Sequence, residues 1–274
     1  GERFLRLLDA ARRAVAPLDD AVVGVAPHSL RAVSPDALGE LLAAVPDGPV
    51  HIHVAEQARE VEDCLAWSGQ RPVAWLLAHV PVDRRWCLVH ATHMDAAELR
   101  DLAASAAVAG LCPITEANLG DGLFPGADFL AAGGRIGVGS DSNVEITAPG
   151  ELRLLEYGQR LTRRARNVLA GASGASTGRS LYDAALAGGA QALGRRIGRL
   201  EAGCRADLVL LDAAHPAFAA VQDDRWLDAY VFAAGQGAVD QVLVAGRTLV
   251  SAGWHRAREA ITARYRRTLA RLAA

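Results

Sequence analysis

The sequence predicts an α/β protein with parallel strands, organised as part of a (β/α)8 barrel. Five short apolar stretches with strand-like patterns are separated by segments of helical spacing, a pattern typical of parallel strands joined by right-handed crossovers. Polar residues directly follow each stretch: His28/Arg31, His53/Glu56, His90/His93, Thr115/Glu116 and Asp141/Asn143. In such a barrel the carboxyl ends of the strands form the catalytic face. An open doubly wound sheet is the alternative, but its glycine-rich phosphate loop is missing.

Composition indicates a large apolar core and excludes several classes of function. The chain has 274 residues, 51% of them hydrophobic, which is enough for one large domain or two unequal ones. A net charge of −2 gives no electrostatic footprint for nucleic acid or an anionic membrane, and no apolar run is long enough to span a bilayer. Four widely spaced cysteines without a C-x-x-C pair indicate a reduced, cytoplasmic protein. All 29 basic residues are arginine, so a Schiff-base or carbamylated lysine is excluded from this chain.

The elements of the first part follow from local signals. Residues 3–16 have amphipathic helical spacing, and residues 34–36 supply a serine N-cap, a proline and an acid that start a helix ending at residue 44. Gly69 interrupts helical material at residues 57–77, and a further helix covers residues 95–105. The expected strands are residues 22–26, 50–54, 86–90, 108–112 and 136–138. Residues 113–125 are expected to form a loop, followed by a short helix before the fifth strand.

The character of the sequence changes in the last third. Two longer helices are expected at residues 148–169 and 180–193, and residues 198–212 read as a turn and a strand. A hairpin at residues 239–250 and a helix at 256–272 complete the chain. We therefore divide the chain into a barrel portion, residues 1–197, and a small β-sandwich portion with a closing helix, residues 198–274.

The stretch at residues 50–56 carries the strongest chemical signal. Strand alternation puts His51 and His53 on one face, with Glu56 three residues further along the chain. Two imidazoles and a carboxylate suit a metal ion and a proton shuttle. The simpler interpretation is a core strand whose histidines are hydrogen-bonded, and this stretch alone does not decide between the two.

The order of polar residues along the strands identifies a family. His53-x-x-Glu56, then His90, then Ser140-Asp141 at successive strand ends resembles the metal-dependent amidohydrolase superfamily. Within it, five segments together resemble the formimidoylglutamate deiminases, iminohydrolases of histidine degradation. These are HIHVAEQ (51–57), WCLVHATH (86–93), GLCPITEANLGDG (110–122), GSDSN (139–143) and LEYGQRL (155–161). Residues 198–212 are similar to the segment that returns the chain to the β-sandwich of that superfamily.

The resemblance implies a mechanism. One zinc ion per site, or another divalent metal, is expected to be held by His53 and Asp141 together with two histidines of the first barrel strand. Zinc lowers the pKa of water towards about 7, so that hydroxide can attack the formimidoyl carbon. Glu56 is expected to carry a proton to the departing nitrogen and His90 to polarise the imine. Asp141 would also accept the proton of the water. N-Formyl-L-glutamate and ammonia are the expected products.

Substrate binding and partners also follow from the resemblance. His28 and Arg31 match substrate contacts, and a guanidinium suits the carboxylate of a glutamate derivative; the simpler interpretation is a helix-entry loop with a solvated arginine. A small-molecule substrate, a homodimer, and neither nucleic acid nor membrane as partner are expected. His51, His93 and Cys112 are interpreted as packed residues rather than functional ones. Glu116, Asn118 and Asp121 could equally form a capped turn and are not included in the site.

The pattern of strands departs from that of the family in the N-terminal part. Only five strands can be counted, matching strands four to eight, so the first three barrel strands and their His-x-His ligands have no counterpart. The alternatives are a related deaminase that acts on a purine or triazine ring, and a non-catalytic remnant that binds a partner through its exposed edge. Arg31 separates the two enzymes, because a dicarboxylate substrate needs a cation and a neutral heterocycle does not.

Overall fold

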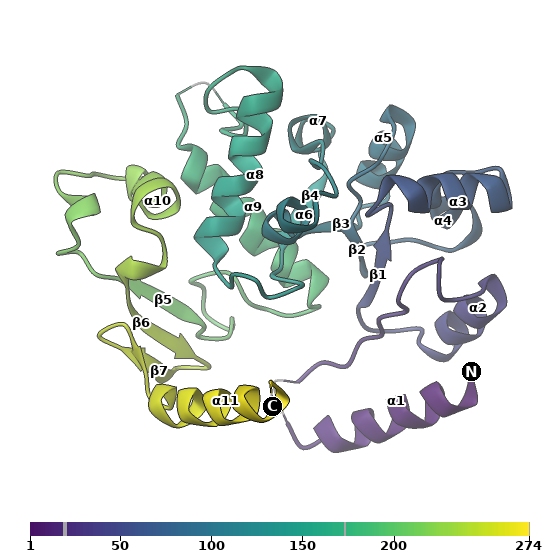
Figure 1. The fold of residues 1–274 in the computed structure, drawn as a ribbon, viewed down its shortest axis with the longest axis horizontal. Helices are drawn as coiled ribbons and strands as arrows, with labels where there is room; N and C mark the ends of the chain where they lie inside the picture. The colour runs from purple at the N-terminus through teal and green to yellow at the C-terminus, as the bar shows by residue number, and fades with distance from the viewer. Residues whose placement is uncertain (19–20, 173, 274) are drawn as a thin grey trace.

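The computed structural model describes residues 1–18, 21–172 and 174–273, and it contains two four-stranded sheets (Figure 1). The first sheet is parallel, in the order β1 (Val50–Val54), β2 (Trp86–His90), β3 (Val108–Leu111) and β4 (Arg135–Val138). Consecutive strands are neighbours, as expected for right-handed crossovers. The α/β class and four of the five expected strands are thus present, but the described residues form no closed barrel.

The segment expected as the first strand, residues 22–26, is not a regular strand. It touches the sheet through a single bridge, Val25 beside Val50, and the chain just after it makes a second bridge, Ser29 beside His53. Val25 exchanges backbone hydrogen bonds with Pro49 and His51, but the next donor in a parallel ladder would be Pro27. Because proline has no N–H, the ladder stops there, and the amide of His53 donates to the carbonyl of His28 instead.

Helices alternate with the strands. They are α1 (Glu2–Val15), α2 (Pro35–Ala44), α3 (Ala58–Ser68), α4 (Pro72–His79), α5 (Ala96–Ala104), α6 (Pro113–Leu119), α7 (Gly126–Ala131), α8 (Ala148–Arg163) and α9 (Thr177–Ala192). The prediction of a loop over residues 113–125 was wrong for α6, since Pro113 at its first position and Glu116 in its first turn start a helix. Helix α8 ends six residues before the predicted limit. Arg164 is left-handed, and the buried Glu156 accepts the amides of Val168 and Leu169.

The second sheet is antiparallel and lies beside α10 (Arg225–Ala229), on the far side of α8 and α9 from β1 (Figure 1). It contains β5 (Leu208–Leu211), β6 (Val239–Val244), β7 (Arg247–Ser251) and β8 (Trp254–His255), and α11 (Arg258–Leu272) follows it. The hairpin and the last helix match the prediction. The short helical turns Pro216–Phe218, Tyr230–Ala234 and Gly235–Ala238 were not predicted. Among the described residues no helix is both long enough and apolar enough to cross a membrane.

Helix α9 packs directly on the backbone of β4. A Cβ atom at Gly188 would lie 1.9 Å from the carbonyl oxygen of Ile136, so only glycine allows this approach. The end of α9 thereby reaches β1, where Nε2 of His51 lies 2.8 Å from the carbonyl oxygen of Ala192. His51 is therefore a half-buried structural residue with a hydrogen-bond partner, as interpreted from the sequence.

Candidate metal and catalytic site

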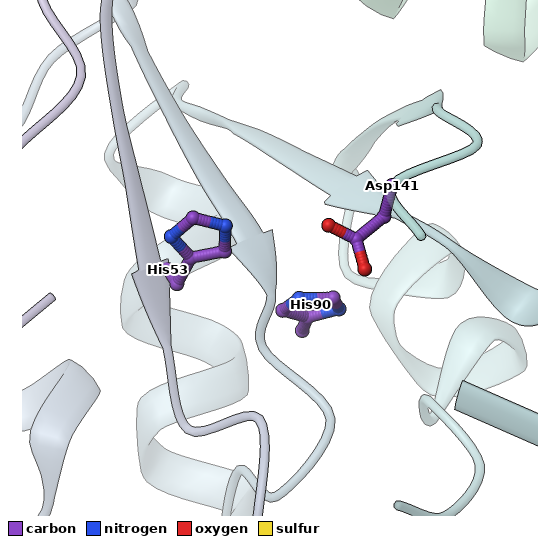
Figure 2. A group of neighbouring side chains, drawn as sticks. All are labelled: His53, His90 and Asp141. Carbon is purple, nitrogen blue, oxygen red and sulfur yellow. The ribbon is translucent and has the colours of Figure 1, made fainter. Parts of the chain in front are cut away.

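Three side chains converge at the carboxyl ends of the parallel strands (Figure 2). His53 comes from β1, His90 ends β2, and Asp141 lies in the loop after β4. One donor atom from each lies within 4.8 Å of the others, which is close enough for a single metal ion to be shared. The strand ends meet at one edge of the sheet, so residues 37 and 51 positions apart become neighbours.

The backbone turns sharply where these residues follow their strands. Ala55, His90 and Asp141 have φ angles of 51°, 69° and 37°, in the left-handed region that non-glycine residues rarely adopt. Such conformations persist where the surroundings hold them, and they cluster at functional sites. After β1 the holding group is the buried Glu60, whose two carboxylate oxygens accept the amides of Ala55 at 3.1 Å and Glu56 at 2.9 Å.

Hydrogen bonds orient both imidazoles towards the centre of the site. Nδ1 of His53 lies 2.7 Å from the carbonyl oxygen of His28, and Nδ1 of His90 lies 3.3 Å from a carboxylate oxygen of Glu116. A carbonyl or carboxylate oxygen only accepts, so each Nδ1 carries the hydrogen and each Nε2 keeps its lone pair. Metal-ligating histidines are typically held in this way. The donor set therefore fits a divalent metal such as zinc.

His90 lies in a strongly acidic environment and is only 1% exposed. Burial alone would lower the pKa of its imidazole. The hydrogen bond that His90 donates to Glu116 and the charges of Glu56, Glu116 and Asp141 outweigh that effect, and the pKa of His90 is raised. Three carboxylates around one buried imidazole also make a favourable place for a cation.

Glu56 lies between a cation and an imidazole. Its Oε2 accepts a hydrogen bond from Arg31 at 2.8 Å, and its Oε1 lies 3.8 Å from Nε2 of His90. The side chain of Glu56 is 14% exposed and that of Arg31 is 34% exposed. The exposed His28 has its ring 5.0 Å from the ring of His53. The expected substrate residues thus lie at the open side of the cluster.

The loop that carries Asp141 is held from both sides. The hydroxyl of Ser142 lies 2.9 Å from that of the fully buried Thr115, and Ser140 donates to Asn143 at 2.9 Å. Thr115 belongs to α6, so this unpredicted helix positions the loop. It thereby fixes the place of the Asp141 carboxylate relative to the two histidines.

Other polar residues near the strands have structural partners. Nε2 of His93 lies 2.7 Å from the carbonyl oxygen of Asp121, and burial raises the pKa of the Cys112 thiol well above its usual range. Both fit the interpretation as packed residues. Glu116 was missed: it is 3% exposed and contacts His90 through the oxygen that also accepts the amide of Cys112. An acid in the first turn after a strand was the available signal, but it equally describes an ordinary helix start.

A large cavity of about 1060 Å³ lies at the opposite end of the strands. It is lined by residues that precede each strand, among them Pro49, Arg85, Ala106 and Gly134, and by the end of α9. None of the three converging residues lines it. Since ligands of parallel α/β sheets bind at the carboxyl ends of the strands, the cluster of His53, His90 and Asp141 is the stronger candidate for chemistry.

Comparisons with known proteins give a consistent result. A family model described as the amidohydrolase family matches residues 2–249. Formimidoylglutamate deiminase of Pseudomonas aeruginosa is 55% identical over 261 residues, covering 94% of this chain and 57% of the relative. 5-Methylthioadenosine/S-adenosylhomocysteine deaminase of Halobacterium salinarum is 34% identical over 202 residues, covering 72% of this chain and 45% of the relative.

Solved structures agree with these relatives. An amidohydrolase from Brucella melitensis superposes with a TM-score of 0.93 at 51% identity, covering 100% of this chain and 60% of that one. A zinc-bound adenosine deaminase from Xanthomonas campestris gives a TM-score of 0.87 at 26% identity, covering 99% of this chain and 62% of that one. The chain thus spans less than two thirds of the length of each of these four proteins.

Proposed function

The chain belongs to the amidohydrolase family, and on this premise we propose that it provides the reacting groups of a formimidoylglutamate deiminase. This enzyme would hydrolyse N-formimidoyl-L-glutamate to N-formyl-L-glutamate and ammonia. The observation that carries the proposal is the convergence of His53, His90 and Asp141 beside Glu56 and Arg31. It combines a metal donor set, a proton carrier and a carboxylate-binding cation in one place.

His53 and Asp141 would hold the metal, which we take to be zinc. The free Nε2 of His53 and the carboxylate of Asp141 are suitable donors. When bound, zinc supplies Lewis acidity and lowers the pKa of water towards about 7. Asp141 would also take up the proton of the attacking water, since its carboxylate has two oxygens.

Glu56 and His90 would handle the charge of the reaction. Glu56 would carry a proton to the nitrogen that leaves as ammonia, because its carboxylate is close to the cluster without contributing a donor to it. His90 donates Nδ1–H to Glu116 and has a raised pKa, so in its protonated form it would donate Nε2–H to the imine and polarise it. Arg31 would bind a carboxylate of the substrate, with His28 beside it.

The larger assignments belong to the same proposal. We infer a (β/α)8 barrel portion at residues 1–197 without its first three strands, and a β-sandwich portion at residues 198–274. Four cysteines without disulfides are consistent with a cytoplasmic enzyme. The homodimer remains a prediction.

The test measures ammonia released from N-formimidoyl-L-glutamate. It uses a completed enzyme, defined as this chain joined to the parts of the Pseudomonas aeruginosa relative that lie outside the match, in the order of that relative. After zinc loading we expect turnover, and Arg31→Met should raise KM about tenfold or more, because a charge-assisted pair contributes about 1.5–3 kcal/mol. Arg59→Met, at an exposed arginine of α3, is the matched control and should leave KM unchanged.

Two results would contradict the proposal. One is release of ammonia from 5-methylthioadenosine or S-adenosylhomocysteine but none from N-formimidoyl-L-glutamate, which would favour a ring deaminase. The other is an unchanged KM in Arg31→Met, which would remove the assignment of Arg31 to the substrate carboxylate.

A further inference from the structure

The side chain of Arg31 is paired with the very carboxylate that would carry protons. Its Nη2 lies 2.8 Å from Oε2 of Glu56 and 3.8 Å from Oε2 of the buried Glu60. A guanidinium that donates to one carboxylate oxygen keeps that oxygen from exchanging protons with a substrate. The group expected to bind the substrate therefore also restrains the group expected to act on it.

Only side chains need to move for this pair to open. The turn that carries Arg31 is held by amides of Ala32 and Val33 that donate to the carbonyl of the buried Ser29. The backbone of Glu56 is held by Glu60 at 2.9 Å. The guanidinium itself is 34% exposed, and Glu56 is its one described side-chain partner at hydrogen-bond distance. A carboxylate arriving from solvent can therefore compete for it.

We propose that Arg31 and Glu56 form an exchangeable latch, in which a carboxylate of the substrate takes Arg31 from Glu56 and so frees Glu56 to move protons. This inference rests on the proposed function. It adds that substrates with a carboxylate are selected in the turnover step as well as in binding, because an amidine without a carboxylate leaves Glu56 engaged with Arg31. In the paired state Glu60 lies 3.8 Å from Arg31 as a second anion, and after exchange the substrate carboxylate becomes the partner of the cation.

The first test measures whether a free carboxylate replaces Glu56 as the partner of Arg31, and it does not depend on enzyme activity. Glutarate, a dicarboxylate without an amidine, is titrated into the 274-residue chain while the Nε–H signal of Arg31 is followed by 15N NMR. Removing the competing carboxylate in Glu56→Gln should tighten glutarate binding about fivefold. Glu116→Gln removes the same charge from a residue that does not contact Arg31, and its effect should be clearly smaller. Arg31→Met should abolish binding.

The second test measures the effect of exchange on turnover. The zinc-loaded completed enzyme is given N-methylformamidine, an amidine without a carboxylate, with and without glutarate. Glutarate should raise kcat about fivefold in the parent and in the Arg59→Met control. Arg31→Met should already show the raised kcat and should not respond to glutarate, since its Glu56 is never held.

The outcomes separate the latch from the proposed function. Equal effects of Glu56→Gln and Glu116→Gln on glutarate binding would overturn the latch, because they would mean that overall charge alone matters. Turnover of N-methylformamidine that glutarate leaves unchanged or inhibits would also overturn it. Absence of ammonia from N-formimidoyl-L-glutamate in the parent would overturn the proposed function, whereas the NMR titration would still report on the pair.

Discussion

His53 and Glu56 lie three residues apart, on either side of the left-handed Ala55, yet their substitution should have opposite consequences. His53→Ala removes a donor from the cluster, so the completed enzyme should lose most of its zinc. Glu56→Gln should keep zinc bound and lose most of the turnover, because in the proposed mechanism the carboxylate carries protons, and it does not belong to the donor set. Elemental analysis and ammonia release on both variants distinguish the two roles. Near-normal kcat in Glu56→Gln would exclude a proton shuttle at this position.

Glu151 of α8 makes a prediction for stability. Burial raises the pKa of its carboxyl from 4.5 to about 7, although the amide of Ile114 opposes this; the charges of Glu116 and Glu145 add to the rise. Between these values the unfolded chain releases the proton and the folded chain keeps it, so stability is lost as pH rises towards and through 7. Since a shift of one pKa unit corresponds to 1.36 kcal/mol, this group contributes up to about 3 kcal/mol to the pH dependence of the free energy of unfolding.

Urea unfolding of the 274-residue chain at pH 5 and pH 8 measures this contribution. In Glu151→Gln the free energy of unfolding should fall less between the two pH values than in the parent, by about 2–3 kcal/mol. The amide oxygen of glutamine can still accept the hydrogen bond from Ile114. Glu62→Gln, at an exposed position of α3, should retain the full pH dependence of the parent. Identical behaviour of Glu151→Gln and the parent would show that this carboxyl titrates normally.

At the residue scale, the sequence predicted where site residues lie better than it predicted which side chains they contact. His53, His90 and Asp141 could be found because each lies near or just beyond the carboxyl end of an apolar strand, and parallel strand ends meet at one edge. The contact between His90 and Glu116 could not be found, since it depends on a helix start that resembles any other. The ion pair of Arg31 with Glu56 was also not predicted, because it joins side chains 25 residues apart whose rotamers depend on packing.

At the scale of elements, α9 and β4 offer a test with an internal control. A Cβ at Gly188 would lie 1.9 Å from the carbonyl oxygen of Ile136 and 2.5 Å from its carbon, and backbone atoms of a strand hydrogen-bonded to β3 cannot move aside cheaply. Gly188→Ala should therefore destabilise the chain by about 1–3 kcal/mol or more. The neighbouring Gly189 has no atom within 4 Å of such a Cβ. Gly189→Ala should be neutral or stabilising by up to about 1 kcal/mol.

The midpoints of urea unfolding of Gly188→Ala and Gly189→Ala, measured at one pH, test this prediction. Equal midpoints for the two variants would mean that α9 does not pack on β4 as the structure describes. If Gly188→Ala is destabilised, His51 should also lose its partner Ala192, and the imidazole signal of His51 should shift in NMR spectra while that of His79, bonded within α4, does not.

Elements with strong local signals were predicted closely. Strand β1 and helix α2 match their predicted limits, because alternation and the cap at Ser34 act within a few residues. Residues 22–26 were predicted as a strand on apolar content, but the missing N–H of Pro27 matters only where the partner strand lies alongside. The end of α8 was missed for a related reason, since Glu156 captures amides that lie beyond the helix.

At the scale of the whole molecule, the 274 residues alone should bind zinc weakly, release no ammonia and associate. Zinc sites use at least three protein ligands, and His53 and Asp141 supply two of those expected. Strand edges without partners invite pairing with another chain. Helix α11 also exposes an apolar stripe, with Ile261, Tyr265 and Leu269 exposed by 55%, 62% and 45%. Metal analysis and sedimentation velocity test this prediction.

The completed enzyme is the control for that comparison. It should bind one zinc per chain under the same loading conditions, and it should not form larger assemblies through the strand edges beside residues 22–26 and beside β4. Stoichiometric zinc and ammonia release from the 274-residue chain would show that another residue, such as His90, His51 or His93, had become a ligand, contrary to the roles given to all three.

The central claim is that a metal binds where β1, β2 and the loop after β4 converge. Diffraction from zinc-loaded crystals of the completed enzyme, recorded at the zinc absorption edge, tests it most directly. We expect one anomalous peak per chain, at about 2.0–2.2 Å from Nε2 of His53 and from a carboxylate oxygen of Asp141. A peak elsewhere, or an empty map at these two side chains in a crystal that contains stoichiometric zinc, would contradict the account.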